Sequence, residues 1–208
     1  VCRGRSRRGG LCESWRLSWV WRCRVRGAGR ESGWSGSGSV GRMSTSPPAV
    51  VGMSVDEVET PALVLDLDAF ERNLDLLASW VVERGVRWRP HAKAHKSVDI
   101  ALAQVALGAS GVCCQKVSEA EGFADGGITD ILVSNEVVGD GKLRRFAELS
   151  GRVNAAICVD DEYHVRALER AAAEIGTRLN VYVEVDVGGN RCGVQPGAAT
   201  AALVRLVD

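Results

Sequence analysis

The chain follows one repeating pattern of apolar and polar positions from Pro61 onward. Short runs rich in β-branched residues are each followed by a longer stretch in which apolar residues recur at helical spacing, which is typical of βαβ units and a largely parallel sheet. Strand starts recur about every 20–25 residues, a spacing that a β/α barrel and a doubly wound sheet share. The pattern predicts strands over residues 62–67, 86–92, 111–115, 130–135, 153–160 and 181–186.

Polar residues stand where the intervening helices should begin. Asp68 and Ser97 are predicted to cap the helices that follow them, because a short polar side chain can accept a hydrogen bond from a free N–H of the first helical turn. Ser118 and Glu121 have the spacing of a capping box at the next helix. The last helical pattern runs into Asp208, after a leading strand and only five further strands. A barrel has eight, so we expect the chain to be a fragment of a longer protein.

Charge divides the sequence into two parts. Residues 1–42 carry ten Arg against Glu13 and Glu31, a net charge of +8, whereas residues 43–208 carry 16 basic and 24 acidic side chains, a net charge of −8. Three interpretations of the first part compete: a basic nucleic-acid arm, an Arg-rich transit peptide and translated upstream DNA. We favour the last, because the segment has no Lys and no Met but four of the six Trp, and Met43 opens an ordinary N-terminus. We expect 1–42 to be disordered and 43–57 to be a flexible N-terminus.

The remaining composition is that of a soluble globular protein, with 46% hydrophobic and 25% charged residues. No apolar run approaches the roughly 20 residues that span a bilayer, and no signal-peptide pattern precedes the globular part, so we expect a cytoplasmic protein. The cysteines of the body lack the CxxC spacing of zinc sites and indicate no disulfide framework; they stand at positions 113, 114, 158 and 192. Cys113 and Cys114 are expected to fill the core.

Functional groups in parallel α/β folds gather at the carboxyl ends of the strands. This rule selects His91, Lys93, His95, Lys96, Gln115, Lys116, Ser134, Asn135, Asp160, Asp161 and the stretch 186–191. If the second strand continues to residue 95, its alternation places His91, Lys93 and His95 on one face. Cationic neighbours then favour the uncharged amine of a buried Lys93, the form that attacks a carbonyl to make a Schiff base. The alternative is a solvated basic loop; a metal site is disfavoured, because no HExxH pattern accompanies the histidines.

The Gly-rich stretch 184–194 fits neither a phosphate loop nor a dinucleotide fingerprint. Val194 and Gln195 stand where a phosphate loop needs Lys and Ser or Thr, and Asn190 replaces the second Gly of the dinucleotide pattern. The stretch does offer Arg191, a permanent positive charge for an anionic cofactor or a substrate carboxylate. The alternative is that Arg191 pairs with Asp186 or with another carboxylate.

Four segments resemble one family of pyridoxal-phosphate enzymes. They are TPALVLDLDAFERNL, RPHAKAHKS, GVCCQKVSEAEGFADGGITDILVSNEVV and VEVDVGGNRCGV. Together they make residues 58–208 similar to the alanine-racemase-like group, and within it to D-threonine aldolases and D-serine dehydratases. The resemblance implies an α/β fold, a partial (β/α)8 TIM-type barrel of about five strands plus the leading strand, and a missing C-terminal β domain that carries the metal ligands.

The resemblance also implies a function. Lys93 is the Schiff-base lysine for pyridoxal 5′-phosphate and Arg191 lies near the cofactor ring, while His91 and Gln115 are expected to orient the cofactor. The activity implied is cleavage of D-threonine and other β-hydroxy-D-amino acids to glycine and an aldehyde, with a divalent Mn or Zn bound outside this chain. D-serine dehydration, racemization and noncatalytic cofactor binding stay open. The expected partner is a small D-amino acid, with no nucleic acid and no membrane, in a monomer or homodimer.

Overall fold

The computed structural model describes residues 49–50 and 52–207. The chain divides into two compact units after Asp66, and each is described by itself. In the first unit the short 3-10 helix η1 (Val55–Glu57) begins at Ser54, whose backbone N–H donates to Glu57 Oε2 at 2.7 Å. The segment 1–42, with its predicted disorder, and residues 43–48 and 51 of the predicted flexible stretch 43–57 lie outside the described residues.

The predicted leading strand over 62–67 is wrong. Residues 62–66 belong to no helix or strand, and helix α2 (Leu67–Glu83) already begins at Leu67. Asp68 therefore lies in the first turn of α2 and is not its N-cap. The physical reason is that a strand needs a partner: no described strand pairs with this segment, and Leu63 and Val64 are exposed.

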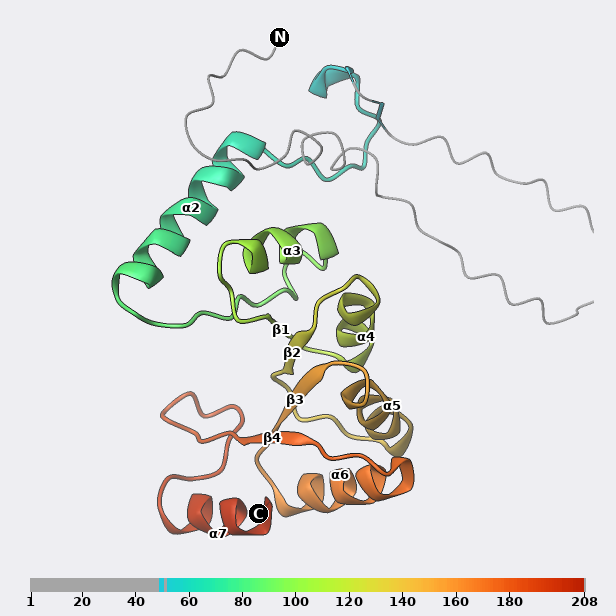
Figure 1. The fold of residues 1–208 in the computed structure, drawn as a ribbon, viewed down its shortest axis with the longest axis vertical. Helices are drawn as coiled ribbons and strands as arrows, with labels where there is room; N and C mark the ends of the chain where they lie inside the picture. Colours follow the sequence, from blue (N-terminus) through green and yellow to red (C-terminus); the bar gives the residue numbers. More distant parts are fainter. Residues whose placement is uncertain (1–48, 51, 208) are drawn as a thin grey trace, which may run out of the picture. The chain divides into compact units, whose positions relative to one another are not determined.

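Four parallel strands form the sheet of the second unit, in the order β1-β2-β3-β4 (Figure 1). Their bounds are β1 (Val112–Cys114), β2 (Asp130–Val133), β3 (Asn154–Val159) and β4 (Asn180–Val183). Each strand pairs with the next in the chain. The predicted α/β class with a parallel sheet is confirmed.

The strand predicted over 86–92 is reduced to a single bridge between His91 and Cys113. The Pro90 carbonyl accepts from the Cys113 N–H at 2.8 Å, and the Ala92 N–H donates to the Cys113 carbonyl at 2.7 Å. Pro90 has no N–H to donate, which limits the ladder on this side. The segment nevertheless adds a fifth position to the sheet, next to β1.

Helices alternate with the strands in the second unit. Their bounds are α3 (Val98–Ala106), α4 (Val117–Asp125), α5 (Asp140–Ser150), α6 (Glu162–Ile175) and α7 (Ala198–Val207). Helices α4, α5 and α6 lie side by side along the sheet (Figure 1). No helix among the described residues is long and apolar enough to cross a membrane.

The strands bury one face more deeply than the other. Ile131 and Val133 of β2, like Ile157 of β3, are fully buried and belong to the same core cluster as Phe146 of α5. On the opposite face Cys113 of β1 is buried, but the other side chains are only partly covered, and Tyr182 of β4 is 56% exposed. Since successive side chains of a strand point to opposite faces, the helices cover one face of the sheet.

Besides Asp68, two further predicted helix caps can be compared with the structure: one is confirmed and one is wrong. Ser97 caps α3, where its Oγ accepts from the Ile100 N–H at 3.3 Å. At α4 the extended residue Lys116 is the N-cap, so Ser118 is already helical, and the carboxylate three residues after the cap is Glu119. Glu121 instead forms an ion pair with Arg145 of α5. The capping-box prediction is thus shifted by two residues.

Candidate active site

The carboxyl ends of the parallel strands form one edge of the sheet, and most of the predicted site residues lie on it. His91 ends the segment beside β1, and Gln115 follows β1. Ser134 follows β2, and Asp160 follows β3. Beyond β4 comes the loop that carries Arg191. Lys93 and Arg191 therefore belong to opposite ends of this edge.

His91 is held by two contacts. Its Nε2 lies 3.3 Å from the Ser134 Oγ, and its Nδ1 lies 3.4 Å from the Lys93 N–H. Burial lowers the pKa of His91, and the positive charge of Lys93 lowers it further, while Glu119 opposes the shift. The imidazole is therefore neutral at neutral pH and offers one N–H and one acceptor nitrogen.

Lys93 lies in a turn and not in a strand. The Lys96 N–H donates to the Ala92 carbonyl at 2.8 Å, which closes the turn around Lys93, and Lys93 itself is exposed. The predicted common face of His91, Lys93 and His95 is therefore wrong. His95 instead packs edge-on against the ring of Phe123, with the ring centroids 6.4 Å apart.

Gln115 contributes its backbone to the site region. Its N–H donates to Glu119 Oε2 at 2.9 Å, and its side chain is exposed just after β1. The neighbouring thiols are buried, and burial raises the pKa of Cys114 to about 12. Cys113 and Cys114 thus fill the core as predicted.

The loop after β4 is built around Asp186. Its Oδ1 accepts from the Gly188 N–H at 2.9 Å and from the Asn190 N–H at 3.1 Å, and these two contacts lower the pKa of Asp186. The Gly193 N–H donates to Asp160 Oδ2 at 3.0 Å, which ties the loop to the end of β3. Arg191 is exposed and forms no ion pair with Asp186 or with any other described carboxylate. The arginine is therefore accessible to a ligand.

A family model matches most of the sequence. Residues 65–208 match the model described as the N-terminal domain of alanine racemase. The chain belongs to this family. Its parallel sheet with helices on one face agrees with a partial barrel of the kind that alanine-racemase-like domains have.

The curated and solved relatives of this chain include aldolases. The chain is 48% identical over 159 residues to D-threonine aldolase of Arthrobacter sp., which covers 76% of this chain and 42% of that protein. It is 47% identical over 160 residues to 3-hydroxy-D-aspartate aldolase of Paracoccus denitrificans, with 76% and 41% covered. The crystal structure of D-threonine aldolase from Filomicrobium marinum matches with a TM-score of 0.75 at 53% identity, covering 77% of this chain and 43% of that one. The chain thus spans less than half the length of these relatives.

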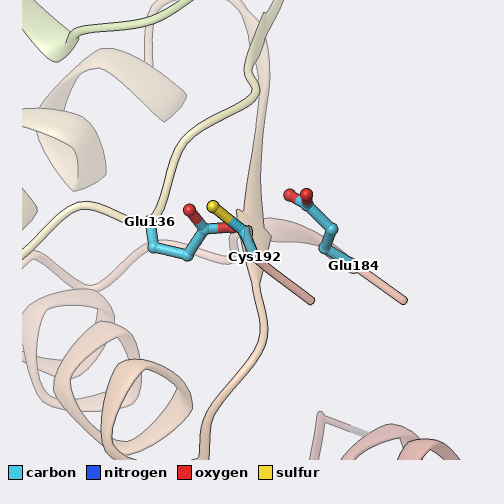
Figure 2. Close-up of side chains that lie close together, drawn as sticks. All are labelled: Glu136, Glu184 and Cys192. Atoms are coloured by element: carbon cyan, nitrogen blue, oxygen red, sulfur yellow. The ribbon is translucent and has the colours of Figure 1, made fainter. Parts of the chain in front are cut away.

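The structure of this chain also brings together three residues that the sequence analysis did not select as site residues. Glu136 follows β2, Glu184 follows β4 and Cys192 lies in the Arg191 loop, yet their ligand atoms lie within 4.8 Å of one another (Figure 2). Glu136 and Glu184 stand within two residues of the strand ends that the sequence rule used, so a wider window around each strand end would have selected them. Cys192 carries no such signal.

The pKa values of two members of this cluster, Glu184 and Cys192, are raised. Burial raises the pKa of Glu184, and the carboxylates of Glu136 and Asp160 raise it further. The Arg191 guanidinium pulls the pKa of Cys192 down, but burial and Glu136 together raise it above its ordinary value. Two carboxylates and a thiol are donors that zinc accepts, but metal ligands must be deprotonated. We therefore assign no metal to the cluster.

Proposed function

We propose that the full-length protein is a pyridoxal-phosphate-dependent lyase that cleaves D-threonine and other β-hydroxy-D-amino acids to glycine and an aldehyde. The observation that carries this proposal is the similarity to D-threonine aldolase and 3-hydroxy-D-aspartate aldolase over about three quarters of the chain. The dehydratase relatives are more distant: D-threo-3-hydroxyaspartate dehydratase from Delftia sp. is 37% identical over 138 residues.

The donor groups at the carboxyl edge fit pyridoxal phosphate. The aldehyde of pyridoxal phosphate reacts with a primary amine, and Lys93 offers an exposed amine in a closed turn. A permanent positive charge stabilises an anionic oxygen of the cofactor, and Arg191 offers an accessible guanidinium. When bound, the cofactor serves as an electron sink for the bond that breaks at the substrate Cα.

The four site residues of the chain then have separate roles. Lys93 holds the cofactor through its amine, and Arg191 stabilises negative charge beside the ring. His91, which is neutral, donates or accepts a hydrogen bond without adding a charge. Gln115 orients the cofactor from the end of β1. These four assignments are proposals, and so is the dependence on a divalent metal, with Mn and Zn as the ions to test.

The proposal is tested by assaying the full-length protein with D-threonine and with D-serine, each with added Mn or Zn. We expect glycine and acetaldehyde from D-threonine, and loss of this activity after treatment with a chelator. Lys93→Ala should abolish both the activity and the visible absorbance of the bound cofactor, whereas Lys142→Ala on the exposed side of α5 should leave both unchanged. Pyruvate from D-serine without cleavage of D-threonine would replace the aldolase assignment with a dehydratase.

A further inference from the structure

Glu119 connects two segments of the candidate site, the end of β1 and the turn that contains Lys96. It lies in the first turn of α4, and its side chain is only 10% exposed. Its Oε2 accepts from the Gln115 N–H at 2.9 Å and from the Lys116 N–H at 3.3 Å. The carboxylate thereby fixes the backbone at the end of β1, where Gln115 lies.

The same carboxylate reaches the turn that carries Lys93. Glu119 Oε1 lies 3.3 Å from Lys96 Nζ, and Lys96 closes the turn through its N–H to the Ala92 carbonyl at 2.8 Å. Lys96 has a φ of 50°, in the left-handed region that a residue other than glycine seldom adopts. Such a conformation persists when surrounding contacts determine it, and the ion pair with Glu119 is such a contact.

The charge of Glu119 is present at neutral pH. Burial alone would raise the pKa of Glu119, but the Gln115 and Lys116 amides and the Lys96 ammonium outweigh it, so that the pKa is lowered. The field of this carboxylate also extends to His91, whose pKa it raises against the effect of burial. Glu119 thus acts on three parts of the site region: the end of β1, the Lys93 turn and His91.

We propose that Glu119 is a positioning residue, which locks the Ala92–Lys96 turn to the end of β1 and so sets the direction of Lys93. This inference rests on the proposed function, since it assumes that the Lys93 amine captures pyridoxal phosphate. An ordinary helix cap would serve α4 without any contact to Lys96. The ion pair to a residue with a left-handed backbone makes Glu119 more than a cap.

The test compares Glu119→Gln, Lys96→Met and the double variant in the full-length protein. One readout is the rate at which added pyridoxal phosphate is trapped on Lys93 by borohydride, measured by mass spectrometry. The other is hydrogen exchange of peptides spanning 92–97, measured without cofactor. We expect trapping to slow by about tenfold or more in each single variant, because a small misplacement of a reacting group greatly reduces its rate.

The double variant decides whether the two residues act as one unit. Trapping in it should be no slower than in the slower single variant, and exchange over 92–97 should be faster in all three variants than in the wild type. A matched control is the exposed ion pair between Arg144 and Glu148 on α5. Arg144→Met with Glu148→Gln should change neither readout.

Wild-type trapping rates in Glu119→Gln, or effects that add in the double variant, would overturn the proposal. Failure of the proposed function looks different: the wild-type protein would then trap no pyridoxal phosphate on Lys93. In that case the exchange measurement decides whether Glu119 holds the turn, and unchanged exchange over 92–97 would reject this role as well.

Discussion

The Nε2 atom of His91 lies 3.3 Å from the hydroxyl of Ser134, which stands 43 residues further along the chain. The Ser134 Oγ in turn lies 3.4 Å from the Cys114 carbonyl, to which it donates. Since the His91 Nδ1 accepts from the Lys93 N–H, a neutral imidazole carries its proton on Nε2 and donates it to Ser134. One hydroxyl thus connects the ends of three neighbouring segments of the sheet.

Replacing Lys93 with Met is expected to raise the pKa of His91. Burial is the main cause of its lowered pKa and stays in place, but the positive charge of Lys93, the second cause, is removed. The shift is measured by following the imidazole protons with NMR as the pH is changed. Lys142→Met is the control, because Lys142 lies on α5. An unchanged pKa in Lys93→Met would mean that Lys93 does not lie near the ring.

A second pH effect is expected at Glu184. Its pKa in the folded protein is raised above the ordinary value of 4.5 by burial, by Glu136 and by Asp160. The stabilisation from the protonated form is therefore complete below pH 4.5 and is lost as the pH rises through the folded-state pKa. The free energy of unfolding of Glu184→Gln, measured in urea from pH 4 to 8, should lack this loss when compared with the wild type.

The control for the Glu184 experiment is a substitution of the neighbouring residue Glu136. Glu136→Gln removes the neighbouring negative charge, so the pKa of Glu184 should move down toward 4.5 and the loss of stability should shift to lower pH. If Glu184→Gln has the same pH profile as the wild type, the two carboxylates do not share a buried environment.

The sequence predicted those features of the fold that depend on neighbours in the chain. The alternation along 130–135 and 153–160 located β2 and β3, because one face of each strand is buried under helices. Ser97 was recognised as a cap because its partner, the Ile100 N–H, lies only three residues away. Both partners of such a contact lie within a few residues of each other in the sequence.

Features that depend on distant partners were not predictable in this way. The segment 62–67 has the composition of a strand but no described strand to pair with, and Pro90 limits the ladder of the next segment. The turn after His91 is closed by Lys96, whose ion pair with Glu119 joins residues that are far apart in the sequence. The strand-end rule located the edge of the site, but it gave no information on which side chains meet there.

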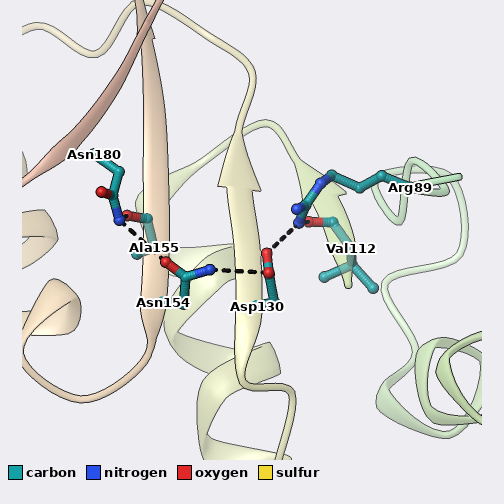
Figure 3. A network of polar contacts seen from close by, with 6 residues as sticks. All are labelled: Arg89, Val112, Asp130, Asn154, Ala155 and Asn180. Carbon is teal, nitrogen blue, oxygen red and sulfur yellow. Dashed lines mark hydrogen bonds and ion pairs between the residues drawn. The ribbon is translucent and has the colours of Figure 1, made fainter. Parts of the chain in front are cut away.

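The amino ends of the strands carry a chain of polar contacts at the edge opposite the candidate site (Figure 3). Arg89 Nη1 donates to Asp130 Oδ1 at 2.5 Å, and Asn154 Nδ2 donates to Asp130 Oδ2 at 2.9 Å. Asn180 Nδ2 donates to Asn154 Oδ1 at 3.1 Å. Asp130 thus links the segment before His91 to β2 and β3, and Asn180 extends the link to β4.

Asp130→Ala is expected to destabilise the protein by about 1–3 kcal/mol, because it leaves Arg89 and Asn154 without their shared acceptor. The side chains of Arg89 and Asp130 are 25% and 32% exposed, so water replaces the lost contacts only in part. Urea unfolding measures the change. The matched control is Asp125→Ala, which removes a more exposed ion pair with Arg152 and should change the stability by less than about 1 kcal/mol. Equal effects of the two substitutions would assign the Asp130 contacts no special weight.

Gly193 makes the tightest approach in the Arg191 loop. It has a φ of 102°, and a Cβ at this position would lie 2.4 Å from the Asp186 backbone nitrogen. Gly193→Ala must therefore displace the loop and weaken the contact of its N–H with Asp160. If Arg191 stabilises negative charge on a bound cofactor, D-threonine cleavage should fall together with cofactor affinity, and both are measured in the full-length protein.

Gly197→Ala separates the steric clash from the backbone conformation. Gly197 has a φ of 97°, but no atom lies within 4 Å of the position that its Cβ would take. Both substitutions incur the strain of a left-handed backbone, about 1–2 kcal/mol, so both should lower the stability toward urea. Only Gly193→Ala should also reduce cofactor affinity, because only there does the methyl group collide with the turn that presents Arg191. Equal losses of affinity in the two variants would mean that the steric clash at Gly193 has no effect of its own on cofactor binding. The role of Arg191 in binding the cofactor would then have to be reassigned.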